Sequence, residues 1–166
     1  MNWFLSAVDG LNELVGRIFS WAVVLIMLIT VYDVTMRNLV GQPTIWAFDV
    51  SNQLYAVHFL MLAGFGLLHH VHVSVDVIWA RWQPRTQAIV DLVSYVVFFL
   101  PFMIMLTWQS YLFAARSWAS RETSWGVMAM PLYPLKSMMV IASILLLLQG
   151  LATIIRRIRA IAQESA

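Results

Sequence analysis

Three of the four histidines lie close together in the middle of the chain, and an aspartate follows them. His69, His72 and Asp76 share one face if this segment is helical, because residues three and four apart lie one turn above each other. Imidazole and carboxylate groups at this spacing could hold a divalent metal. No fourth ligand follows nearby, and polar residues beside a membrane surface more commonly stay free of metal. We therefore expect no metal site, and assign His72 and Asp76 structural or partner-contact roles.

Two other ionisable residues lie inside or beside long apolar runs. His58 could be a haem ligand or a proton carrier, but a haem held between helices needs a second histidine in another run, and the other runs contain none. Asp33 could relay a proton or ion. However, it lies about 24 Å along a helix from Arg17, near the far membrane interface, and Arg37 follows four residues later. We favour a hydrogen-bonded histidine in the bundle interior and an interfacial ion pair of Asp33 with Arg37.

The sequence lacks the motifs of common enzymes and of independent carriers. It has no cysteine, and it contains no Gly-x-Ser-x-Gly, glycine-rich phosphate loop or His-Glu-x-x-His motif. The apolar runs also lack the several buried ionisable residues, or the matched pair of broken helices, that ion-coupled carriers usually have. We therefore expect no catalytic and no cofactor-binding residue, and we interpret the chain as a non-enzymatic partner subunit.

The composition places these residues in a membrane. The 166 residues are 61% hydrophobic and 11% charged, with a mean hydropathy of +0.80, which leaves too little polar surface for a soluble domain. Aromatic residues, including eight tryptophans, suit the ends of spans at the headgroups. The net charge of +2 comes from clusters near the span ends, so it indicates membrane orientation and no nucleic-acid partner.

The chain predicts an all-α membrane protein that forms one domain over residues 1–166. It has four apolar runs of spanning length, at about residues 17–37, 49–68, 89–115 and 137–155. An amphipathic, interfacial helical lead-in precedes them over residues 1–16. Pro101 should kink the third span because it removes a backbone hydrogen bond. A polar, tryptophan-bearing loop is expected over residues 116–134.

The segment 69–85 lies between the second and third spans and is predicted to be an amphipathic helix in the membrane interface. Its valines alternate strictly, which would also suit a strand, but a lone strand at a bilayer would leave its backbone groups unpaired. The termini and this segment hold six of the ten basic residues, and the other two loops hold four. This distribution favours cytoplasmic termini.

The connection between the first two spans carries a recognisable pattern. Arg37, Gly41, Pro43, Trp46 and Asp49 read as Arg-x-x-x-Gly-x-Pro-x-x-Trp-x-x-Asp. This pattern resembles the small membrane subunit of tripartite ATP-independent periplasmic (TRAP) transporters. That family typically has glutamate at the position of Asp49, which is one methylene longer and carries the same charge.

Three further segments are similar to the same family: residues 72–76 (HVSVD), 130–136 (MPLYPLK) and 147–150 (LLQG). The resemblance implies a three-part uptake system in a bacterial inner membrane. A periplasmic binding protein captures an organic acid and delivers it to a large membrane subunit, which carries the substrate and usually sodium. The small subunit packs against the large one as a scaffold. Arg37, Trp46 and Asp49 are then candidate partner contacts, although they could also simply anchor span ends.

Two other classes stay open from the residues alone. A four-helix, haem-binding anchor of a redox enzyme is the main alternative, and a haem absorbance band would identify it. A small channel or exporter is disfavoured, because few polar residues lie within the spans.

Overall fold

The computed structural model describes all residues except 1, 43, 70–82, 127 and 165–166. The described residues are almost entirely helical, and they contain one isolated β-bridge and no strand. The helices and π-helical turns are α1 (Asn2–Ser20), α2 (Ala22–Thr35), η1 (Met36–Val40), α3 (Ile45–Leu68), α5 (Pro84–Ser94), η2 (Tyr95–Phe99), α6 (Leu100–Ser120) and α7 (Tyr133–Glu164).

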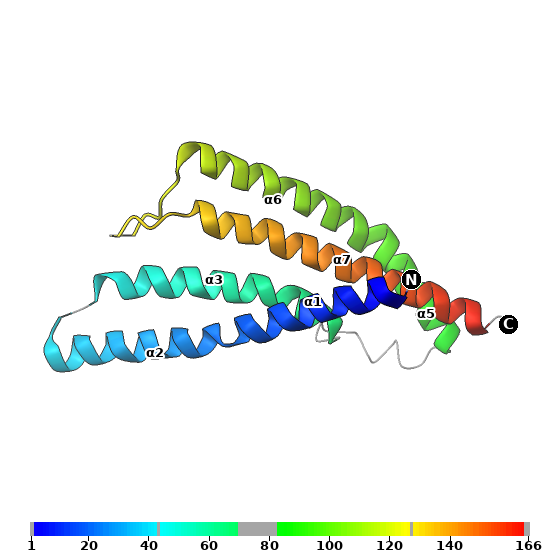
Figure 1. Ribbon diagram of the computed structural model, residues 1–166, viewed down its shortest axis with the longest axis horizontal. Coiled ribbons are helices and arrows are strands. Elements are labelled where there is room, and N and C mark those ends of the chain that lie inside the picture. Colours follow the sequence, from blue (N-terminus) through cyan, green and yellow to red (C-terminus); the bar gives the residue numbers. More distant parts are fainter. Residues whose placement is uncertain (1, 43, 70–82, 127, 165–166) are drawn as a thin grey trace.

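Four helical stretches are long and apolar enough to cross a membrane: Trp3–Val40, Ile45–Leu68, Ile89–Ser120 and Tyr133–Arg159. This confirms the predicted all-α fold with four spans. Two helical hairpins, α2 with α3 and α6 with α7, lie side by side, and α3 and α7 occupy the middle (Figure 1). Both termini lie at one end of the bundle, and the connections 41–44 and 121–132 lie at the other (Figure 1). We call the latter the loop end.

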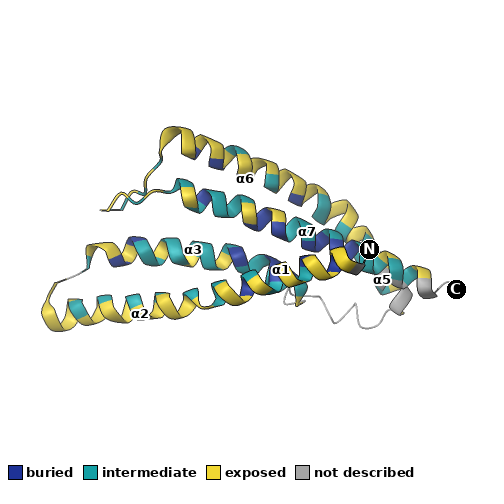
Figure 2. Cartoon of the chain, viewed as in Figure 1, coloured by how far each residue is buried: buried dark blue, intermediate teal, exposed yellow. Residues whose placement is uncertain are grey.

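Burial follows this arrangement. The middle helix α7 holds more buried residues than any other helix, whereas α2 and α6 are largely exposed (Figure 2). One apolar cluster, Met61 with Ala142 and Leu145, joins α3 to α7. The exposed surfaces of α2 and α6 consist mainly of large apolar residues, as expected for helices that face acyl chains or another membrane subunit.

The lead-in over residues 1–16 is helical, as predicted, but it is not a separate surface element. It belongs to α1, which runs on almost directly into α2 (Figure 1). Leu5 and Val8 pack against Ala152 of α7. The buried face of α1 therefore contacts protein, whereas the prediction assigned its apolar side to the membrane surface.

The helices extend further than the predicted spans. The third helical stretch bends (Figure 1), and its bend contains the π-helical turn η2 just before Pro101. A proline ring clashes with the carbonyl four residues earlier, here that of Val97, and a π turn relieves this clash. The predicted kink therefore occurs, while α6 continues to Ser120 and shortens the predicted loop 116–134. Most of the predicted interfacial segment 69–85, including His72 and Asp76, lies outside the described residues.

Candidate functional site at the loop end

Asp33 organises the turn between α2 and α3. Its carboxylate accepts a hydrogen bond from Arg37 Nη2 at 3.2 Å and one from the backbone N–H of Thr44 at 3.1 Å, and the Thr44 hydroxyl also donates to it. Gly41 ends η1 with φ +71°, a left-handed conformation that glycine adopts without strain. The predicted ion pair of Asp33 with Arg37 is confirmed, and the sequence reasoning missed Thr44.

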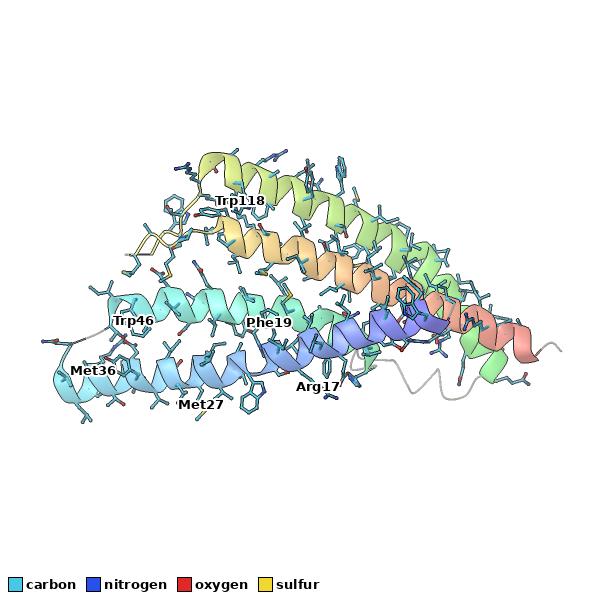
Figure 3. All side chains as sticks on the ribbon, viewed as in Figure 1. Arg17, Phe19, Met27, Met36, Trp46 and Trp118 are labelled. Atoms are coloured by element: carbon cyan, nitrogen blue, oxygen red, sulfur yellow. The ribbon has the colours of Figure 1, made fainter. Side chains whose placement is uncertain are left out.

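Trp46 and Asp49 lie on α3, which begins at Ile45, so the connection is shorter than predicted. The Trp46 ring stacks on Tyr32 of α2 with ring centroids 6.1 Å apart (Figure 3). This contact fixes the angle at which α3 leaves the turn, because aromatic pairs add specific geometry to apolar burial. Trp46 is therefore positioned within its own hairpin and keeps part of its ring exposed.

Asp49 reaches across to the connection between α6 and α7. Its side chain is only 6% exposed, and its Oδ2 accepts the backbone N–H of Met128 at 3.3 Å. A Cβ added to Gly126 would lie 1.9 Å from Asp49 Oδ1, so only glycine fits against this carboxylate. The structure thus joins two segments, one around Asp49 and one around Gly126, that lie far apart in the sequence.

The second connection has its own internal support. Ser124 N–H donates to the Met130 carbonyl at 2.7 Å, and Leu132 N–H donates to the Glu122 carbonyl at 2.9 Å. Lys136, which is buried, forms an ion pair with Glu122 and lies 3.7 Å from the centroid of the Phe113 ring. The hydrogen bond from the Lys136 ammonium lowers the pKa of the Glu122 carboxyl below its usual value.

A pocket of about 260 Å³ opens between α3 and this connection. The side of α3 contributes Phe48, Asn52 and Gln53 around Asp49, and the connection contributes Ser124, Trp125 and Gly126. Gln53 Nε2 donates to the Pro131 carbonyl at 3.4 Å, which is a weak second link between the two hairpins. The loop end therefore combines a buried carboxylate with an open, partly aromatic cavity. We refer to it as the Asp49 pocket.

A sequence model of the family described as "Tripartite ATP-independent periplasmic transporters, DctQ component" matches residues 26–160. This match covers most of the chain and includes the whole loop end. The chain belongs to the DctQ family. DctQ is the small permease component of TRAP transporters, a transporter component and not an enzyme, as predicted. No curated protein matches the chain in sequence.

Membership of the DctQ family sets aside the alternative of a haem-binding redox anchor. His58 of this DctQ chain lies in α3, and its Nδ1 hydrogen-bonds the carbonyl of Phe19 at 2.8 Å. Phe19 is the next-to-last residue of α1, which ends at Ser20 before α2 begins (Figure 3). The carbonyls at a helix end lack partners within the helix, and His58 supplies one for Phe19. The predicted hydrogen-bonded interior histidine is confirmed.

The opposite end of the DctQ chain carries a second polar layer, which joins α1 to its neighbours. Asn12 and Gln149 are buried and hydrogen-bonded at 2.9 Å. The layer also contains four ion pairs: Glu13 with Arg17 at 2.8 Å, Glu13 with His69 at 2.7 Å, Asp91 with Arg157 at 2.9 Å, and Asp9 with Arg156. Within the described residues, no three histidine or acidic side chains lie close enough to hold a metal. His69 is thus held by Glu13, and His72 and Asp76 are not described.

Proposed function

We propose that this DctQ-family chain scaffolds the large transport subunit of a TRAP system. In this proposal the complete system takes up an organic acid that a periplasmic binding protein delivers, and sodium is the coupling ion in the large subunit. The chain itself supplies a rigid membrane frame and a surface for its partners. It carries neither the substrate nor the ion.

The observation that supports this role is the position of the charged groups. On three spans, two charged or ionisable residues lie twenty positions apart: Arg17 and Arg37, Asp49 and His69, and Lys136 and Arg156. Twenty residues are about 30 Å of helix. This distance equals the thickness of the hydrocarbon core. The charges therefore form two layers, one at each interface.

Asp33 belongs to the loop-end layer through its ion pair with Arg37. Between the two layers, the spans contain no other acidic or basic residue except His58. Its Nδ1 already bonds a backbone carbonyl. A protein that moves an anion and a cation through the membrane needs groups that bind them at intermediate depth. Transport chemistry then has to come from the large subunit, and this chain contributes structure.

The orientation follows from the same layers. The terminal end carries Arg17, Arg156 and Arg157, and also Arg159 in the last turns of α7. We propose that this end faces the cytoplasm, because basic residues are enriched there. The loop end then faces the periplasm, from which the binding protein arrives.

Reconstitution in liposomes tests the proposal. Labelled organic acid should accumulate under a sodium gradient only when this chain, the large subunit and the binding protein are all present. Uptake by this chain alone would refute the scaffold role. Equal uptake by the large subunit and binding protein without this chain would refute it as well.

Two variants test the role of the loop end in the complete system. Trp46→Ala removes the contact with Tyr32, and Asp49→Ala removes the link to Met128, so both should lower uptake. Trp3→Ala is a matched control, because Trp3 is an exposed tryptophan at the opposite end. Unchanged uptake in both loop-end variants would reduce these residues to ordinary anchors of the span ends.

A further inference from the structure

Among the carboxylates whose side chains the structure describes, all but one form an ion pair with a base of the same chain. Asp9, Glu13, Asp33, Asp91 and Glu122 each form an ion pair. Asp49 forms none in the part of the chain that the structure describes, although at 6% exposure it is well buried. A buried carboxylate without a countercharge is strongly disfavoured.

The groups around Asp49 do not replace a countercharge. Its Oδ2 receives one long hydrogen bond from a neutral backbone N–H, that of Met128, and no described side chain donates to it. The carboxylate lies on the wall of the Asp49 pocket, which is open at the loop end. A cation that enters this pocket from outside would therefore meet an uncompensated negative charge.

The rest of the pocket suits an organic cation better than a metal ion. Phe48 and Trp125 line it, and both side chains are highly exposed. Aromatic faces attract ammonium and guanidinium groups, and a carboxylate accepts their hydrogen bonds. The side-chain amides of Asn52 and Gln53 add polar groups along the wall. The volume of about 260 Å³ is below the usual range of about 300–1,000 Å³ for small-molecule sites, so it suits a single protein side chain.

We propose that the Asp49 pocket receives an arginine or lysine side chain of the soluble binding protein. The pocket lies at the loop end, beside the turn of residues 121–132, and a fully exposed Trp125 is part of its lining. A protein that approaches from water reaches this place directly, whereas a membrane subunit packs along the flanks of the helices. The identity of this partner rests on the proposed function. The geometry of the unpaired carboxylate does not depend on it.

The affinity of the binding protein for the complex tests the proposal. The complex of small and large subunits is placed in nanodiscs, and the fluorescently labelled cognate binding protein is titrated against it at several salt concentrations. Asp49→Asn keeps an oxygen that accepts the Met128 N–H and removes only the charge. We expect it to raise Kd by about tenfold or more, and to flatten the salt dependence of binding. Asp91→Asn makes the same chemical change at the opposite end and should leave Kd within about twofold.

Charge reversal identifies the partner. Each exposed arginine and lysine of the binding protein is changed to glutamate, and one of these variants should reproduce the loss seen with Asp49→Asn. Combining that variant with Asp49→Lys should restore most of the affinity. An unchanged Kd for Asp49→Asn would overturn the proposal. If the complex instead loses its large subunit when Asp49 is changed, the base belongs to that subunit, and the assignment to the binding protein is wrong.

A sodium ion in the pocket is a further outcome that would overturn the proposal. Binding of the two partners would then depend on sodium and be indifferent to every basic residue of the binding protein. The titration measures docking without transport, so it is independent of uptake. If the wild-type system docks through Asp49 but accumulates no organic acid, the proposed function fails and the pocket assignment stands.

Discussion

The hydrogen bond between Asn12 and Gln149 gives the sharpest prediction for stability, because it joins α1 to α7 through two fully buried amides. Gln149 accepts from Asn12 Nδ2 at 2.9 Å and donates to Asp9 Oδ1 at 3.1 Å. Replacing it by leucine keeps most of the volume and removes both bonds. Bonds to a neutral group contribute about 0.5–1.5 kcal/mol, and bonds to a charged group about 1.5–3 kcal/mol.

Their sum, about 2–4.5 kcal/mol, is an upper range for Gln149→Leu. Asn12 keeps its bond to the Val8 carbonyl, and Asp9 keeps Arg156, so neither partner is left without a bond. Hydrogen bonds between membrane helices average about 0.6 kcal/mol in double-mutant cycles. We therefore expect the free energy of unfolding to fall by about 2 kcal/mol.

The measurement is denaturant unfolding in mixed micelles, with Gln109→Leu as control. Gln109 is an exposed glutamine of α6 for which no hydrogen bond is observed, and the same substitution there should not destabilise the protein. Combining Gln149→Leu with Asn12→Leu should give a coupling energy of about 0.5–1 kcal/mol. A loss below about 0.5 kcal/mol for Gln149→Leu, or one equal to the control, would show that the buried amides do not hold α1 in place.

Three further predictions concern the turns and the orientation. Gly41→Ala should lower the free energy of unfolding by about 1–2 kcal/mol in chemical denaturation, because φ is +71° at this position. Gly10 lies within a helix with open space around it, so the control Gly10→Ala should not lower the free energy of unfolding. The pKa of Glu122 is lowered, so its pair with Lys136 stabilises the fold fully above the unfolded pKa of about 4.5, and this stabilisation is lost as pH falls through the lower folded pKa. In Glu122→Gln, the free energy of unfolding should therefore change less as pH is lowered. An unaltered pH dependence in this variant would contradict the prediction. Reporter fusions at the C-terminus and near Trp125 should report the cytoplasm and the periplasm, and the reverse result would overturn the orientation.

The spans could be predicted from the sequence because hydropathy and length determine them. The pair of Asp33 with Arg37 was predicted for a related reason, since residues four apart on a helix are neighbours. Glu13 and Arg17 form a pair at the same spacing, which was not predicted from the sequence. The first residue of α3 was harder to predict, because Trp46 and Asp49 occupy the first turns of this helix and resemble loop residues in composition. A sequence pattern marks such residues without showing which side of a helix they occupy.

Contacts between distant segments could not be predicted in this way. Asp49 with Met128 and Asn12 with Gln149 join residues far apart in the chain, and each depends on a glycine that lets the two groups approach. Gly126 lies against Asp49, and Gly64 lies against Asn12, where an added Cβ would be 2.1 Å from Oδ1. A single glycine in an apolar run has many possible partners. Its partner becomes visible only when the helices are placed together.

The two ends of the bundle are held together by different means, and this difference gives Asp49 a double role. The hairpins converge toward the end with the termini (Figure 1), where buried amides and ion pairs join α1, α5 and α7. At the loop end, the described hydrogen bonds between the hairpins are those of Asp49 with Met128 and of Gln53 with Pro131. Asp49→Ala removes a link between the hairpins and a charge together, whereas Asp49→Asn removes the charge alone. If docking depends on the charge, the asparagine variant should bind the binding protein as weakly as the alanine variant while unfolding like wild type. If docking depends on the hairpin link, asparagine should behave as wild type in both measurements.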